Sequence, residues 1–174
     1  MDRITKQLVT DYLNSAELPS TDESKDFEFF CNYTVISNEF NKTFDVESIT
    51  IGNGLDTGID GIAIIVNGYL VEEIDEIDDL LKKNGYLEVT YIFIQSKTSS
   101  NFESKDINNF YFGVNDFFSE KPELPRNDDI TRLANLSNHI LGQASSFKEN
   151  PKCKTFFITT GVRNEDDGNV NAVL

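Results

Sequence analysis

Polar side chains interrupt two strongly apolar stretches of this sequence, at positions where a buried strand normally has none. Residues 58–66 are rich in β-branched side chains, as expected of a strand buried on both faces, yet they include the carboxylate of Asp60. Residues 91–97 end in an amide, a hydroxyl and an ammonium, in the order Gln95-Ser96-Lys97. Because side chains alternate along a strand, the amide and the ammonium share a face. We therefore expect these groups to meet Asp60 at neighbouring strand ends.

The carboxylate of Asp60 has two interpretations. An ionised carboxylate at the start of a buried strand loses hydration and needs a compensating partner. A divalent cation would be one such partner. The ammonium of Lys97 would be another, and the pair would then be a structural salt bridge without chemistry.

The spacing of these residues resembles a known nuclease signature. Asp60 followed by Gln95-Ser96-Lys97 is similar to the D…(D/E/Q)-x-K motif of the PD-(D/E)xK nuclease superfamily, in the glutamine-bearing form of Mrr-like restriction endonucleases. The stretches 27–33, 56–62 and 93–100 resemble the amino-terminal part of abortive-infection phage-resistance (AIPR) proteins. The resemblance covers residues 26–118, and the later segments share only the order of elements.

The resemblance implies an Mg²⁺- or Mn²⁺-dependent endonuclease site. Asp60 would bind the cation directly through a hard carboxylate oxygen. The amide oxygen of Gln95 and the backbone carbonyl of Ser96 would be further ligands. Lys97 would orient the attacking water and stabilise the charge that develops on the phosphate. Glutamine in place of an acid removes one negative charge, so we expect weaker metal binding than in the two-carboxylate form.

Two further acids, Glu28 and Asp56, are candidates for the same site. Glu28 corresponds to the glutamate on the first helix of the superfamily, and the resemblance implies that it holds a metal-bound water. The alternative is an acid in the first helical turn that complements the helix dipole. Asp56 is either a turn former, which its surroundings favour, or an outer member of the acid cluster.

Hydrophobic periodicity predicts the elements around these residues. We expect helices at 4–13, 27–40, 71–83, 102–118 and 128–147, strands at 46–51, 58–66, 91–97 and 154–160, and a hairpin turn at Asn67-Gly68. The core face of the second helix is predicted to be the stripe Phe29, Tyr33, Ile36 and Phe40. The order matches an α/β fold, namely the restriction-endonuclease-like αβββαβ core with a mixed central sheet flanked by helices.

The chain divides into a polar, helical lead-in at 1–25, with a linker from residue 18, and a nuclease-like domain at 26–174. Its apolar ending, Asn171-Ala172-Val173-Leu174, predicts an excised amino-terminal domain of a longer protein. The partners expected are nucleic acid, DNA rather than RNA, and the remaining domains of that protein. Homodimerisation is left open.

Net charge argues against tight nucleic-acid binding. Thirty acidic and 15 basic residues give −15, whereas nucleic-acid binders usually present a basic patch. Six of the acids crowd the helix expected at 71–83, where a solvated face is the ordinary explanation. Either the acids lie away from the site or another domain supplies the basic groove, and we expect weak binding by the isolated domain.

The remaining features indicate a cytoplasmic, soluble protein. No apolar run approaches the ~20 residues that span a bilayer, and no signal peptide precedes Cys31 and Cys153, so we expect two buried thiols. His139, the only histidine, is expected to have a surface or capping role. Three functions stay open: a metal-dependent nuclease of a phage-defence protein, a catalytically weak or inactive nuclease-like domain that binds nucleic acid or a partner chain, and a purely structural module.

Overall fold

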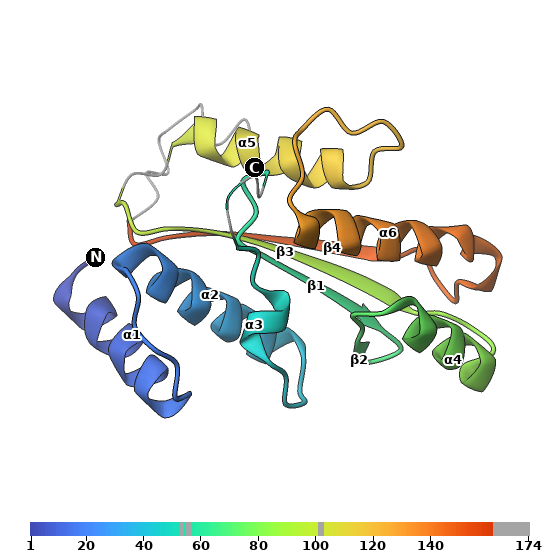
Figure 1. Ribbon diagram of the computed structural model, residues 1–174, viewed down its shortest axis with the longest axis horizontal. Helices are drawn as coiled ribbons and strands as arrows, with labels where there is room; N and C mark the ends of the chain where they lie inside the picture. Colours follow the sequence, from blue (N-terminus) through green and yellow to red (C-terminus); the bar gives the residue numbers. More distant parts are fainter. Residues whose placement is uncertain (53, 55–56, 101–102, 162–174) are drawn as a thin grey trace.

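A four-stranded mixed sheet separates two layers of helices in the computed structural model of the chain (Figure 1). The structure describes residues 1–52, 54, 57–100 and 103–161. The strands are β1 (Gly61–Val66), β2 (Tyr69–Leu70), β3 (Val89–Lys97) and β4 (Lys152–Thr159), in the order β2-β1-β3-β4. β3 pairs antiparallel with β1 and parallel with β4. The predicted mixed sheet flanked by helices is confirmed.

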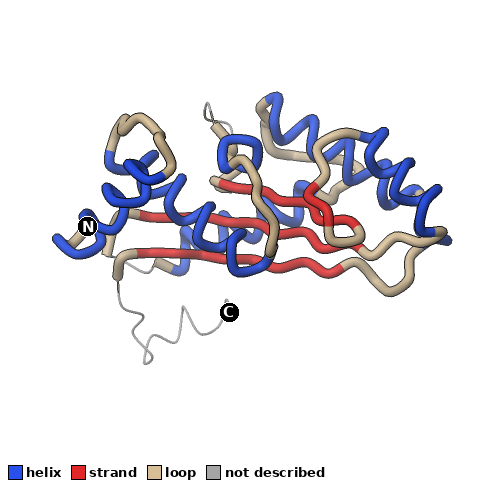
Figure 2. Tube along the Cα trace, turned by 90° about the horizontal axis from the view of Figure 1, so that it is seen from below, coloured by secondary structure: helices blue, strands red, loops and turns tan. Residues whose placement is uncertain are grey.

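The two helical layers come from different parts of the chain. One face of the sheet carries α1 (Arg3–Ser15), α2 (Glu23–Glu39) and the single turn α3 (Val46–Ile49). The other carries α5 (Ser104–Phe117) and α6 (Asp128–Gly142), while α4 (Ile74–Asn84) packs beside α6 near the β1–β2 hairpin. A 3-10 turn (Ala144–Ser146) leads back to the sheet. Figure 2 shows the three long strands running side by side among these helices.

Strand alternation builds a separate core on each face of the sheet. Ile62, Ile64, Tyr91 and Phe93 pack with residues of α4, α5 and α6. The intervening residues Ala63, Ile92 and Ile94 pack with α2 and α3. A third, smaller cluster joins α1 to α2, so the amino-terminal helix is part of the packed structure.

The hairpin prediction is confirmed. Asn67 and Gly68 form the two-residue loop between Val66 and Tyr69, with φ values of 50° and 77°. Both central residues of a type I′ turn need positive φ, which asparagine and glycine tolerate best.

The strand predicted at 46–51 is wrong. Residues Val46–Ile49 form the helical turn α3, because Asp45 caps it by accepting a hydrogen bond from the amide of Glu47. Val46 and Ile49, three residues apart, then both reach the core. Only Thr50 bridges to the sheet, at Gly61. Of the three strands expected at 46–51, 58–66 and 91–97, the second and third are therefore observed, as β1 and β3, and the two-residue β2 follows β1.

The apolar stripe predicted for α2 is also wrong in part. Tyr33 is 42% exposed, whereas Phe27, Cys31 and Asn32 are buried. The reason is that α2 lies between the sheet and α1, so its buried surface covers more than one stripe.

Other boundaries shift locally. Helix α4 begins at Ile74, because Glu73 and Glu76 form a capping box there, and α6 ends at Gly142. Gly113 lies inside α5 and permits a close approach, since a Cβ there would clash with the carbonyl of Thr57.

The two cysteines differ in exposure. Cys31 is buried as predicted, but Cys153 is exposed, which corrects that prediction, and both are free thiols. Cys153 is exposed because it lies near the start of β4, the edge strand of the sheet. His139 on α6 contacts Asp78 of α4 at 2.8 Å. Among the described residues, no helix is both long and apolar enough to cross a bilayer. Asp56 and the apolar ending 171–174 lie outside the described residues.

Candidate functional site

Asp60 lies where β1 begins and β3 continues past it. The register pairs Gly61 with Ile94, and the amide of Asp60 donates to the carbonyl of Ile94 at 2.8 Å. Before Asp60 the chain turns away from β3 through Thr57 and Gly58, whose φ values are 57° and 75°. The last residues of β3, from Gln95 on, therefore have β4 on one side, and the described part of the chain places no strand on the other.

The side chain of Asp60 fills this vacated position in the sheet. Its Oδ2 accepts hydrogen bonds from the amide N–H of Ser96 at 2.7 Å, from Gln95 Nε2 at 2.7 Å and from Ser96 Oγ at 3.0 Å. All three residues are buried: Asp60 is 7% exposed, Gln95 is 3% exposed and Ser96 is 5% exposed. A carboxylate buried this deeply needs charge-assisted donors, and these three supply them. The expected meeting of Asp60 with Gln95 and Ser96 is thus observed.

Gln95 turns its amide NH₂ group, not its oxygen, toward Asp60. Nε2 donates to Asp60 Oδ2 at 2.7 Å and also to the backbone oxygen of Ser96 at 3.2 Å. Two of the three oxygens expected to bind a cation therefore already face one electropositive group. A metal that joined them would have to replace that NH₂ group.

Two spacings of the donor set suit a small oxygen-liganded cation once the Gln95 amide is turned. In octahedral Mg²⁺ coordination with bonds of about 2.1 Å, neighbouring ligand oxygens are about 3.0 Å apart. The terminal nitrogen of Gln95 has similar spacings, 2.7 and 3.2 Å, to Asp60 Oδ2 and Ser96 O. A half-turn of the amide exchanges its nitrogen and oxygen. The roles of Asp60, Gln95 and Ser96 as ligands stay predictions.

Lys97 ends β3 without pairing with Asp60. It is half-buried, two residues beyond Gln95 on the same face of the strand. Its ammonium makes no hydrogen bond or ion pair with the part of the chain that the structure describes, whereas Asp60 is satisfied by Gln95 and Ser96. The alternative of a structural Asp60–Lys97 salt bridge is therefore wrong for this conformation.

Glu28 lies on α2, which covers the face of the sheet opposite to the side chains of Phe93 and Gln95. Burial raises the pKa of the Cys31 thiol to about 12, and the negative charges of Asp60 and Glu28 add to this shift. Both carboxylates therefore lie within electrostatic reach of the same sulfur. The acids in the first turn of α2 are Glu23 and Asp26, so the helix-dipole role proposed for Glu28 belongs to residues nearer the helix start. Its described contact is an acceptor bond from Ser24 Oγ at 3.5 Å.

Asn32 is a residue of this region that the sequence motifs do not include. It follows Glu28 by four positions and is 0% exposed. Its Nδ2 donates to the backbone oxygen of Asp60 and to Thr50 Oγ1, both at 3.0 Å. The available signal was a single amide inside an otherwise apolar helical run, which is costly to bury unless it is hydrogen-bonded.

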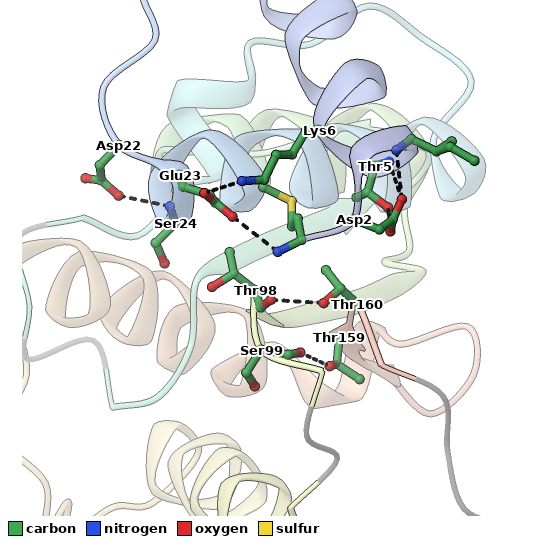
Figure 3. A network of polar contacts seen from close by, with 12 residues as sticks. Asp2, Thr5, Lys6, Asp22, Glu23, Ser24, Thr98, Ser99, Thr159 and Thr160 are labelled. Carbon is green, nitrogen blue, oxygen red and sulfur yellow. Dashed lines mark hydrogen bonds and ion pairs between the residues drawn. The ribbon is translucent and has the colours of Figure 1, made fainter.

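The ends of β3 and β4 are tied together beyond Lys97 (Figure 3). Thr160 Oγ1 donates to the carbonyl of Thr98 at 2.9 Å, and Thr159 Oγ1 donates to that of Ser99 at 2.6 Å. The start of α2 lies beside them, where Glu23 accepts from Lys6 and from the amino group of Met1. Lys6 is thereby neutralised and contributes little free positive charge at this end of the sheet.

The acidic helix lies at the other end of the sheet. Figure 1 places α4 beside the start of β3, whereas Lys97 ends that strand. The acids concerned are Glu72, Glu73, Asp75, Glu76, Asp78 and Asp79. This part of the negative charge is segregated from Asp60, as one of the two charge hypotheses requires.

The described residues contain no group of three or more His, Cys, Asp or Glu side chains arranged to hold a metal ion. The ligands implied for this site are instead one carboxylate, one amide and one backbone carbonyl. Comparison with protein-family models, with curated proteins and with solved structures found no match to this chain.

Proposed function

We propose that this chain is a metal-dependent, phosphodiester-cleaving nuclease domain of a phage-defence protein, with a restriction-endonuclease-like architecture. One observation carries the proposal. Asp60, Gln95 and the backbone of Ser96 come together at one point of the sheet, with Lys97 following on the same strand. That is the combination of an acid, an amide and a lysine that the D…QxK pattern implies.

Each residue has a distinct task under this proposal. Asp60, Gln95 and Ser96 would hold Mg²⁺ or Mn²⁺ through oxygen, and Glu28 would hold a water bound to it. When bound, the cation supplies positive charge beside the scissile phosphate. Lys97 would donate hydrogen bonds to the attacking water and to the phosphate oxygens, since a charged lysine has donors only.

Lys97 is suited to that task because its ammonium has no ion-pair partner among the described residues. An ammonium held in an internal ion pair would have to break it before it could serve a substrate. The Lys97 ammonium has no such partner among the described residues, and it lies two residues from the buried amide of Gln95.

A second function is favoured by the hydrogen bonds of Asp60. Asp60 Oδ2 already accepts three hydrogen bonds. The NH₂ group of Gln95 faces this oxygen, where the amide oxygen would be needed as a metal ligand. A domain locked in this arrangement would be a catalytically weak or inactive nuclease-like module that binds nucleic acid or a partner chain. The purely structural module is the limiting case, in which Asp60 only completes the sheet.

A metal titration followed by a cleavage assay separates these functions. If Asp60 is a ligand, Mn²⁺ at ~100 times its dissociation constant stabilises the fold by about 2.7 kcal/mol. For a domain of this size the melting temperature rises by several degrees. Asp60→Asn should abolish the rise.

The matched control is Asp11→Asn, which removes the same charge from an exposed position on α1. Equal shifts in wild type and Asp60→Asn would mean adventitious binding to the acidic surface, and would favour the structural module. Where the shift depends on Asp60, incubation with DNA and RNA substrates then separates an active nuclease from an inactive one.

A further inference from the structure

A buried amide joins α2 to the start of β1. Asn32 joins Asp60 O and Thr50 Oγ1 through the same nitrogen, at 3.0 Å each. Its own oxygen, Oδ1, is buried and has no hydrogen-bond partner among the described residues. Leaving such an oxygen unsatisfied costs free energy, of the order of 1–3 kcal/mol. The position of the Asn32 amide, which leaves its oxygen without a hydrogen bond, therefore needs an explanation.

Gly61 makes room for that amide. A Cβ at Gly61 would lie 2.5 Å from Asn32 Oδ1, 2.8 Å from its Cγ and 2.9 Å from Nδ2. The whole amide group therefore rests against the backbone of the residue that follows Asp60. The glycine and the asparagine form one close-packed joint between helix and strand.

This joint links the positions of two residues of the candidate site, Asp60 and Glu28. Asp60 is fixed through its backbone, because its N–H donates to Ile94 and its carbonyl accepts from Ile51 and Asn32. Glu28 is one helical turn before Asn32, on the same side of α2. Any movement of α2 along β1 would change the separation of the two carboxylates.

We propose that Asn32 is the positioning residue of the site: its amide fixes α2 on β1, and thereby sets the separation between Glu28 and Asp60 that cation binding needs. The inference rests on the proposed function and deepens it. The Oδ1 atom without a partner is then the cost of holding the helix this close to the strand.

The test uses the whole chain carrying Cys153→Ser, which leaves Cys31 as its only thiol. Asn32→Leu keeps the branched shape and the number of heavy atoms of the side chain and removes both hydrogen bonds. Asn38→Ala is the matched control, because Asn38 lies on the same helix and its amide bonds only to Thr34 O. Thr50→Val is a milder second variant that leaves the Asn32–Asp60 bond in place, and it serves if Asn32→Leu does not fold.

Two measurements are made on each variant. The first is Mn²⁺ affinity from the melting shift, for which changes in the residues that support metal ligands typically cost 10–100-fold. We expect a loss of that size in Asn32→Leu, a smaller loss in Thr50→Val and none in Asn38→Ala. The second is the rate at which a thiol reagent labels Cys31, which lies between Glu28 and Asn32 on α2 and is buried in the cluster that joins α1 to α2, so that loosening of α2 should expose it. We expect labelling at least tenfold faster in Asn32→Leu.

The outcomes distinguish this inference from the function on which it rests. Wild-type Mn²⁺ affinity and wild-type labelling in both Asn32→Leu and Thr50→Val overturn the inference alone. Faster labelling without a loss of affinity also overturns it, because α2 would then have moved without consequence for the site. An Asp60-independent response to Mn²⁺ in the wild type overturns the proposed function, and the positioning role with it.

Discussion

The carboxylate of Asp60 accepts the backbone N–H of Ser96 at 2.7 Å and so takes the place of a strand in the sheet. In a regular antiparallel pair, a backbone carbonyl from β1 would accept that N–H. The same carboxylate is the first metal ligand expected at the site. A structural role and a catalytic role therefore compete for one oxygen.

This relationship predicts that the metal-free Asp60→Asn variant is less stable than wild type. The substitution keeps a neutral oxygen acceptor but loses the charge that strengthens three hydrogen bonds. We expect unfolding in urea to show a loss of about 1–3 kcal/mol. Asp11→Asn, on the exposed surface, should change stability by less than about 0.5 kcal/mol. An unchanged or raised stability in Asp60→Asn would mean that repulsion among carboxylates outweighs these hydrogen bonds.

Lys97→Ala should separate catalysis from metal binding. The ammonium has no ion-pair partner in the described chain, so its removal should change the free energy of unfolding by less than about 1 kcal/mol. A charged lysine cannot ligate a cation, so the Mn²⁺-dependent melting shift should persist while cleavage is lost. Lys105→Ala, an exposed lysine on α5, is the control for a general loss of positive charge. Loss of the metal shift in Lys97→Ala alone would contradict these roles.

Stability should fall in alkaline solution through Cys31. Burial, followed by the charges of Asp60 and Glu28, raises the pKa of this thiol from 9.0 to about 12. Below pH 9 the thiol is protonated in both the folded and the unfolded chain, so its contribution is fully present. Between pH 9 and about 12 the unfolded chain releases the proton first, and the contribution is lost.

The measurement is the free energy of unfolding at several pH values in wild type and Cys31→Ala. The variant should lose stability less steeply between pH 9 and 12, whatever the packing cost of the substitution at pH 7. Burial also raises the pKa of Tyr12, to about 12, so some alkaline dependence should remain in the variant. Parallel curves for the two proteins would show that Cys31 ionises normally in the fold.

Nucleic-acid binding by this chain should be weak and confined to low salt. The net charge of −15 repels a polyanion, and the cation nearest Asp60 on β3 is the single residue Lys97. Each neutralised phosphate contributes a slope of about −0.9 to log K against log salt, so few contacts predict a shallow slope. Fluorescence anisotropy with labelled DNA and RNA at 20–200 mM salt measures both quantities. Tight binding at physiological salt would show that other cations form a continuous groove.

Local sequence determined the elements that carry the site. Residues 91–97 run from four apolar side chains to Gln95-Ser96-Lys97, and they lie in β3, where strand alternation puts Gln95 and Lys97 on one face. Asn67-Gly68 specifies its own hairpin, because asparagine and glycine best tolerate the positive φ that both turn positions need. The meeting of Asp60 with Gln95 and Ser96 needs in addition the pairing of β1 with β3, which brings together residues 35 and 36 positions apart.

Tertiary packing decided what the local pattern left open. Residues 46–51 have the β-branched content of a strand, but the Asp45 cap and the core beneath α2 turn the first four into a helix. Tyr33 is exposed and Asn32 buried because α2 is covered by both the sheet and α1, which no single helical stripe reveals.

The orientation of the Gln95 amide is also a tertiary property. It depends on which oxygens surround it, and those come from Asp60, 35 residues away, and from the backbone of Ser96. Its orientation is set by electrostatic contacts across the sheet and not by the spacing of residues along the chain.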